Sequence, residues 1–269
     1  MDSTTDVPEM YTGAWQLLGE GPDAPQAYWL QTQRLHASIL VPAGRPDFSG
    51  ASSLTDLGMD ELLWLADQQG VAGACIVEGD TLHRRRQVDF QTSRGKPFVR
   101  RMRRQGELLL EETLAGTEQV TWRKISPPDA EVIALRFQDE GTAAGDQYKG
   151  YLLIVGEHFL FMRDRAGFAP QAESLRVLAE CRDYERETLM ELLDFEVSFG
   201  LRTGGSQPWE ITLSTLPFRE GKPLLAPTAF EAIMQNAGRQ PQRVQRNGKV
   251  WLRRWSLDEW THALGVRPK

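Results

Sequence analysis

A cluster of arginines between Arg84 and Arg104 is the strongest chemical signal in the sequence. This stretch contains nine lysine and arginine residues and one acidic residue, Asp89, so its local charge is +8 in a chain whose net charge is −6. Side chains alternate between the faces of a β-strand, so some of the arginines at 84–86 must face inward unless a β-bulge intervenes. A buried guanidinium requires a carboxylate or an anionic ligand, because an unpaired buried charge is costly. The stretch therefore predicts buried ion pairs or an anion-binding pocket.

Carboxylates and tryptophans elsewhere in the first half of the chain could complete such a pocket. Asp89, Glu111 and Glu112 are the available partners for an inward-facing arginine. Arginine would fix an anionic head group, tryptophans would form apolar walls, and glutamines would add hydrogen bonds. The ligand-binding residues that we expect are Trp15, Trp29, Gln31, Arg84, Arg86, Asp89, Gln91, Glu112 and Trp122. The alternative is that the arginines form a solvated outer face and the tryptophans fill the core.

A second set of polar residues lies in the other half of the chain. The ligand-binding candidates there are Glu196, Ser198, Ser214 and Arg219. The nearby Trp209 and Trp251 are more typical of a core than of a stacking platform.

Other common kinds of reactive site leave no trace in the sequence. The four histidines, at positions 36, 83, 158 and 262, are scattered, and there is no H-E-x-x-H or C-x-x-C motif. A Walker loop, a G-x-S-x-G elbow and a G-x-G-x-x-G fingerprint are also missing from the sequence. We therefore expect no metal and no cofactor, and we assign no catalytic residue.

The elements that would position these residues occur twice. A helix, two strands and a glycine-lysine-proline turn return in the same order 126 residues later. The first copy covers 59–69, 71–77, 83–91 and 94–97, and the second covers 183–193, 195–201, 209–216 and 220–223. When the sequence is aligned with itself at an offset of 122 residues, Trp29-Leu30 and His36 also align with Tyr151-Leu152 and His158. We predict two tandem copies of one unit; the alternative is one large β domain with chance similarity.

Strand patterns dominate both copies. We expect a flexible tail at 1–10, a first unit at 11–127, a second unit at 130–256 and a C-terminal helix at 257–269. In the strand at 35–41, Leu35, Ala37 and Ile39 should face a core, while His36 and Ser38 should face water. Residues 175–181 also alternate and predict a strand. Many short antiparallel strands favour closed barrels, because closure removes exposed sheet edges.

Composition limits the compartment and the partners. Apolar residues make up 41% and charged residues 25% of the chain, as in ordinary globular proteins. We recognise no signal peptide at the start and no apolar run long enough to span a bilayer. With only Cys75 and Cys181, the chain is expected to be cytoplasmic and free of disulfides. Its acidic net charge argues against nucleic acid as a partner.

The start of the first strand, Gly13-Ala14-Trp15, resembles that of the lipocalin-like (calycin) superfamily. The tandem arrangement is similar to a family of double lipocalin-like barrels of unknown function. The segments that carry this likeness are Tyr28-Trp-Leu-Gln-Thr, Gln87-Val-Asp-Phe-Gln, Asp194-Phe-Glu-Val-Ser-Phe-Gly and Ser214-Thr-Leu-Pro-Phe-Arg-Glu-Gly, and it extends from Tyr11 to Arg254. The resemblance implies an all-β fold with a few short helices, arranged as two tandem antiparallel barrels. It implies almost nothing about activity, since fold does not fix function.

Three functions are compatible with these observations. The first is a non-enzymatic protein that binds a small apolar or anionic ligand in a barrel cavity. The second is an interaction module with filled barrels, whose basic strands dock an acidic protein partner. The third is an isomerase or lyase that uses a cluster of arginine and carboxylate side chains. We expect no nucleic-acid or membrane partner, and a cavity of a few hundred Å³ would favour the first function over the second.

Overall fold

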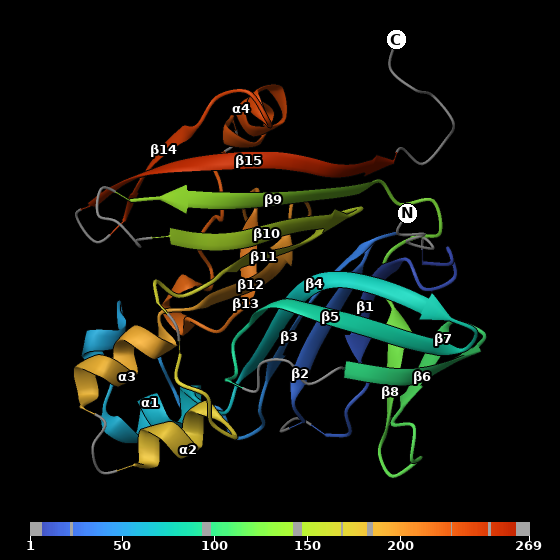
Figure 1. Cartoon of the computed structure of the whole chain (residues 1–269), viewed down its shortest axis with the longest axis horizontal. Coiled ribbons are helices and arrows are strands. Elements are labelled where there is room, and N and C mark those ends of the chain that lie inside the picture. The colour runs from blue at the N-terminus through green and yellow to red at the C-terminus, as the bar shows by residue number, and fades with distance from the viewer. Residues whose placement is uncertain are drawn as a thin grey trace.

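The computed structural model describes residues 7–21, 24–92, 98–141, 147–167, 169–181, 185–226, 228–246 and 249–261. These residues form two stacked antiparallel β units and four short α-helices (Figure 1). The predicted fold class, mostly β with a few short helices, is confirmed. No helix among the described residues is both long enough and apolar enough to cross a membrane.

The first unit is a closed barrel in which each strand pairs with the next along the chain and the last pairs with the first. Its strands are β1 (Gly13–Leu17), β2 (Gln26–Gln31), β3 (Leu35–Val41), β4 (Gln69–Glu78), β5 (Thr81–Asp89), β6 (Phe98–Gln105), β7 (Leu108–Glu112) and β8 (Gln119–Lys124). The 3-10 helix η1 (Leu54–Asp56) and the helix α1 (Met59–Leu65) join β3 to β4.

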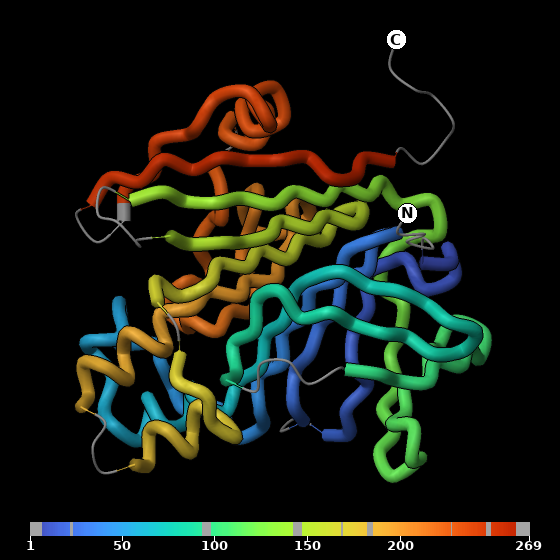
Figure 2. The backbone as a smooth tube through the Cα atoms, viewed as in Figure 1, coloured from blue at the N-terminus to red at the C-terminus, as the bar shows by residue number. Residues whose placement is uncertain are grey.

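The second unit is a curled sheet of seven strands in the order β13-β12-β11-β10-β9-β15-β14. Its strands are β9 (Val132–Glu140), β10 (Gln147–Val155), β11 (His158–Arg163), β12 (Glu196–Leu201), β13 (Glu210–Ser214), β14 (Gln242–Arg246) and β15 (Lys249–Thr261). The helices α2 (Leu175–Glu180) and α3 (Arg186–Leu193) join β11 to β12, and η2 (Pro217–Arg219) and α4 (Ala229–Asn236) join β13 to β14. The chain passes from the barrel to this sheet through the segment between β8 and β9 (Figure 2).

The order of elements in the barrel returns in the sheet. In both units the helices follow the third strand, and the last strand pairs with the first, β8 with β1 and β15 with β9. No strand of the sheet occupies the place that β6 takes in the barrel, because α4 lies between β13 and β14 in the chain. Phe230, Ile233 and Met234 of α4 belong to the apolar cluster on one face of the sheet. The second unit is therefore an open, curled sheet where a closed barrel was expected.

The largest hydrophobic core lies between the two units. It joins the outer wall of the barrel, including Leu30 and Ile39, to the face of the sheet opposite α4, including Leu153. Tyr28 of β2 stacks on Phe199 of β12, with ring centroids 3.7 Å apart. The two units therefore share this core, in addition to a cluster inside the barrel and a cluster between the sheet and α4 that each belong to one unit.

This shared core corrects the expected environment of β3. Leu35, Ala37 and Ile39 do face a core, but it is the core between the units. His36, on the opposite face, is fully buried, where contact with water was expected. The reason is closure: the second face of a barrel strand faces the barrel interior.

Two expectations about secondary structure are wrong. Residues 175–180 form α2 and not a strand, because Ser174 caps the helix by accepting a hydrogen bond from the Val177 N–H. Residues 257–261 continue strand β15, where a helix was expected; the rest of that predicted helix, 262–269, lies outside the described residues. A β-bulge between Leu257 and Glu259 interrupts the alternation that would reveal a strand.

The beginning of the chain and the second sequence echo also differ from expectation. Val7, in the segment predicted as a flexible tail, is buried and donates its N–H to the Gln33 carbonyl at 2.7 Å; residues 1–6 lie outside the described residues. Trp29 faces the barrel interior, whereas Tyr151, its predicted counterpart, faces the core between the units. The match at an offset of 122 therefore aligns opposite faces of the two strands.

Replacing Phe199 with alanine should destabilise both units together. The change removes the ring that stacks on Tyr28 in the shared core. The cavity that it leaves should lower the free energy of unfolding by about 3 kcal/mol or more. Urea denaturation followed by tryptophan fluorescence and by circular dichroism should show one transition, shifted to lower urea. The control is Leu114→Ala at an exposed position, which should change the free energy of unfolding by less than about 0.5 kcal/mol. Two separate transitions, of which one shifts, would contradict a shared core.

Candidate functional site

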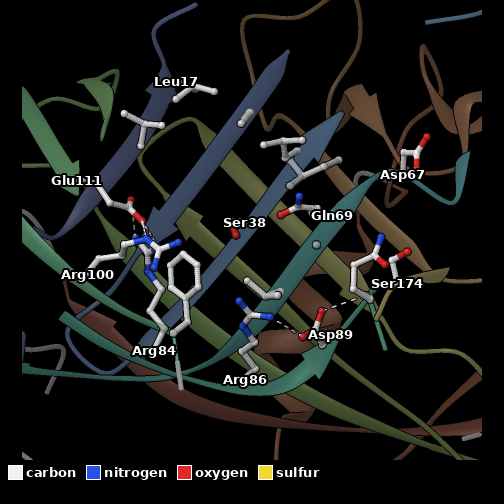
Figure 3. Close-up of a pocket in the computed structure, with 18 of the residues that line it drawn as sticks. Leu17, Ser38, Asp67, Gln69, Arg84, Arg86, Asp89, Arg100, Glu111 and Ser174 are labelled. Atoms are coloured by element: carbon white, nitrogen blue, oxygen red, sulfur yellow. Dashed lines mark hydrogen bonds and ion pairs between the residues drawn. The ribbon is translucent and has the colours of Figure 1, made fainter. Parts of the chain in front are cut away.

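A cavity of about 730 Å³ opens at one end of the barrel. Ser38, Val71 and Asp89, neighbours across β3, β4 and β5, form one wall of it. Ala66, at the end of α1, and Ser174, the N-cap of α2, also line it. Figure 3 shows the charged side chains that converge on this space from β5, β6 and β7.

Arg84 and Glu111 form the most buried ion pair of the cavity. Both Arg84 terminal nitrogens donate to the Glu111 carboxylate, at 3.1 and 3.3 Å, and both residues are less than 10% exposed. The Trp122 Nε1–H donates to the same carboxylate at 2.8 Å, and the Arg84 guanidinium lies 4.4 Å from the ring of Trp29. Trp122 thereby holds the carboxylate and Trp29 the guanidinium, so each charge of the pair has a partner and a second contact.

A β-bulge brings Arg86 and Asp89 to the same side of β5. Residues three apart normally face opposite sides of a strand, but the pairing of β4 with β5 shifts by one residue next to Gln87. Both side chains therefore line the cavity, and the Arg86 Nη1–H donates to Asp89 at 3.0 Å. The Gln91 N–H donates to the other carboxylate oxygen at 3.0 Å.

Arg100 is a third arginine at the cavity. Its guanidinium lies 4.0 Å from the ring of Phe98, and the guanidiniums of Arg84 and Arg86 lie 5.2 and 4.9 Å from the same ring. Its Nε is 3.7 Å from Glu111, which is already held by Arg84. Burial lowers the pKa of Arg100, as do the neighbouring Arg84 and Arg86, against the opposing effects of Glu111 and the more distant, exposed Glu118. Arg100 is thus the least compensated cation of the cavity.

Burial raises the pKa of two side chains in the barrel, Asp89 and Cys75. Desolvation raises the pKa of Asp89, and it outweighs the opposing charge of Arg86. Burial also raises the pKa of the Cys75 thiol to about 12, so this cysteine is a neutral side chain of the barrel interior. A thiol in that state is not a nucleophile at neutral pH.

The structure brings together most of the residues expected in the first pocket. Arg84, Arg86, Asp89, Gln91 and Trp122 line the cavity. Trp29 lies behind Arg84, and Trp15 and Gln31 are buried deeper in the barrel. Whether these residues bind a ligand stays a prediction.

Glu112 was placed in the pocket and lies outside it. It pairs with Arg101 and Arg103 at 3.2 and 3.6 Å on the outer face of the barrel. Along β7 the side chain of Glu111 faces inward and that of Glu112 outward, because successive side chains alternate. The sequence analysis did not include Phe98 and Arg100 in the pocket. They are two residues apart on one strand, so their side chains share a face, and this spacing could have indicated them.

The second predicted set is also brought together. Ser198 donates to Glu196 at 3.0 Å and lies 3.0 Å from Ser214, while Arg219 pairs with Glu196 at 3.0 Å. Burial acts to raise the pKa of Glu196, but Arg219 and Arg163 together with hydrogen bonds from Arg219 and Ser198 hold it below its usual value. Glu196 and Arg219 line a second cavity, of about 850 Å³, on the sheet.

The second cavity is electrically balanced where it is buried. Its three arginines, at 163, 219 and 253, each pair with one of the carboxylates at 194, 196 and 139. No group of three or more metal-ligating side chains occurs among the described residues. The barrel cavity therefore differs from the sheet cavity in having a cation in excess.

Comparisons with known proteins give no family. No family model matches the sequence, and no curated protein matches it either. A similar solved structure is that of an uncharacterized protein, YLR301w, from Saccharomyces cerevisiae, with 14% sequence identity and a TM-score of 0.47. The alignment covers 92% of this chain and 98% of that chain. A likeness at this level indicates no function.

Replacing Glu111 with glutamine should destabilise the barrel strongly. Glutamine can still accept the Trp122 hydrogen bond, but it leaves the buried Arg84 without a counter-charge, which costs about 3 kcal/mol or more. The matched control is Glu112→Gln on the outer face, where the loss should be about 1 kcal/mol or less. Urea denaturation measures both; equal losses would show that the Arg84 pair is not buried.

Replacing Asp89 with asparagine should change how stability depends on pH. A carboxyl whose pKa is raised by folding binds its proton more tightly in the folded state, so it makes the folded state less stable as pH rises above about 3.8 toward the folded-state pKa. The wild-type protein should therefore lose stability relative to Asp89→Asn across this window. Free energies of unfolding measured for both proteins between pH 3.5 and pH 7 test this; a constant difference would refute it.

Proposed function

We propose that the protein binds a small organic molecule with an apolar body and one negative charge in the barrel cavity. The observation that carries the proposal is the imbalance of buried charge there. Three arginines, Arg84, Arg86 and Arg100, face two buried carboxylates, Glu111 and Asp89. A monoanionic ligand would supply the missing charge.

Further carboxylates at the rim do not cancel this imbalance. Asp67, Glu118 and Glu173 line the entrance but are exposed, so water and salt screen them. Asp67 in addition pairs with Arg176 at 2.8 Å. The excess positive charge of the arginines therefore acts on a molecule bound in the inner part of the cavity, away from the rim.

The remaining lining suits an apolar molecule. Leu17, Leu40, Val71 and Val120 contribute aliphatic side chains, and Phe98 adds an aromatic ring. These apolar side chains stand beside the charged ones, and a volume of about 730 Å³ lies within the usual range for a small-molecule site. The lipocalin-like character of the barrel is part of the same proposal, since such barrels hold one small ligand.

The two other functions have weaker support. An interaction module with filled barrels fits the deep end, where Trp15, Trp29 and Leu109 pack together, but it does not account for the open cavity. For an isomerase or lyase, the supporting observation is the raised pKa of Asp89 at the cavity wall. Among the described residues, the hydrogen-bond partners of Asp89 are Arg86 and the Gln91 N–H, and neither is a nucleophile or a general base.

A pair of fluorescent probes tests the proposal. The anion 8-anilinonaphthalene-1-sulfonate and the neutral N-phenyl-1-naphthylamine share one ring system and differ in the sulfonate. Arg100→Gln should weaken binding of the anion about tenfold, the loss expected for one charge-assisted hydrogen bond, and leave binding of the neutral probe unchanged. Arg123→Gln, at an exposed position on β8, is the control and should affect neither probe.

The outcome is decided by the difference between the probes. Equal loss of both probes in Arg100→Gln would indicate damage to the cavity and not a lost charge. An unchanged affinity for the anion in Arg100→Gln, or an equal loss in Arg123→Gln, would contradict a monoanion site at Arg100. Circular dichroism of each variant confirms that its fold is intact.

A further inference from the structure

Behind the cavity, a group of buried polar atoms has no hydrogen-bond partner among the described residues. The atoms are Trp29 Nε1, Gln31 Oε1, both ring nitrogens of His36, and Arg84 Nε. Trp29, Gln31 and His36 are fully buried, and Arg84 is 7% exposed. Buried polar groups are almost always paired with protein or ordered water, so several open ones in one barrel mark a place where another molecule binds.

These atoms lie directly inward of the cavity. Along β3, His36, Ser38 and Leu40 share the face toward the barrel interior; Ser38 and Leu40 line the cavity, and His36 is two residues, about 7 Å, further in. Gln31 is the cross-strand partner of His36 on β2. The polar group therefore lies on the inner side of the cavity, and Arg84 belongs to both.

Gly73 lies between His36 and Arg86 in one row across the barrel wall. His36 pairs with Gly73 across β3 and β4, and Gly73 pairs with Arg86 across β4 and β5. Because Gly73 has no side chain, none stands between the histidine and the cavity-lining arginine in this row. A Cβ at Gly73 would collide with the Arg85 carbonyl, so the close approach of β4 and β5 requires glycine at this position.

The inner group suits a neutral polar ligand atom. Burial, and then the charge of Arg84, hold the pKa of His36 well below its usual value, so the imidazole is neutral with one donor and one acceptor nitrogen. The Arg85 carbonyl lies near the ring and can engage one nitrogen only, which leaves the other open. The Gln31 carbonyl oxygen would repel an anion and accept from a hydroxyl.

We infer that the ligand is an organic acid with a hydroxyl at the end opposite its charge, and that His36 and Gln31 bind this hydroxyl. The inference rests on the proposed function, because it extends the ligand held at Arg100. The carboxylate would lie at the arginines, the apolar body beside Ser38 and Leu40, and the hydroxyl would exchange hydrogen bonds with the inner group. A site built around open polar atoms should reject a ligand that leaves them unpaired.

Matched acids of increasing length measure this preference. The 4-hydroxyphenyl-substituted acetate, propionate and butyrate are each compared with the phenyl acid of the same length by isothermal titration calorimetry. For the length that spans the site, the hydroxyl should strengthen binding about tenfold. His36→Leu should abolish the advantage of the hydroxyl and keep the affinity for the phenyl acid, whereas Arg100→Gln should weaken both acids equally.

Nuclear magnetic resonance of the wild-type protein provides a second measurement if His36→Leu does not fold. With ¹⁵N-labelled histidine, the hydroxy acid should shift the ring nitrogens of His36, and the phenyl acid of the same length should not. His158, which lies at the core between the units and stacks on Phe199, serves as the internal control. Shifts of equal size from both acids would contradict the inference.

The results separate this inference from the proposed function. Equal affinity for hydroxy and phenyl acids at every length, or no measurable binding of any hydroxy acid, overturns a hydroxyl site at His36. If the sulfonate probe still depends on Arg100 in that case, the monoanion site stands and the inner group holds water alone. If Arg100→Gln leaves every anion unaffected, the proposed function falls with the inference.

Discussion

The buried pair of Arg84 and Glu111 is the interaction on which the interior of the barrel depends. Two charges removed from water are stable only when each is matched, and here Trp122 and Trp29 complete the surroundings of the pair. The pair also determines the charge of the cavity. Arg84 already balances the negative charge of Glu111, so Glu111 does not fully balance Arg100 as well. The third arginine is left with an incomplete counter-charge, and the cavity becomes a place for an anion.

The walls of this cavity are held in position by the second unit. Strands β2, β3 and β4 of the barrel have one face toward the interior and the other toward the sheet, so the same strands serve the cavity and the shared core. Glu259 of β15 adds a polar link, since its carboxylate accepts hydrogen bonds from Thr32, Gln33 and Arg34 at the turn between β2 and β3. The order of elements repeats between the units, but only the barrel closes, and among the described residues its cavity has one more arginine than inward-facing carboxylates.

The sequence predicted the β architecture, the repeated order of elements and the presence of inward-facing arginines with nearby carboxylates. It could not predict which carboxylate meets which arginine, because that depends on strand register: Glu111 faces inward and Glu112 outward by one residue. The bulge at Gln87, which puts Arg86 and Asp89 on one side, depends on pairing with β4. His36 was expected to face water because its strand alternates, and alternation alone does not reveal that a barrel closes over the second face.

The central claim, that the cavity holds an organic anion at Arg100, is tested most directly by native mass spectrometry of freshly purified protein. The account predicts a bound small molecule that ionises as an anion when it is released from the wild-type protein, and its loss from Arg100→Gln. A wild-type protein that carries nothing and takes up no organic acid when incubated with one, or an adduct that Arg100→Gln retains in full, would contradict it.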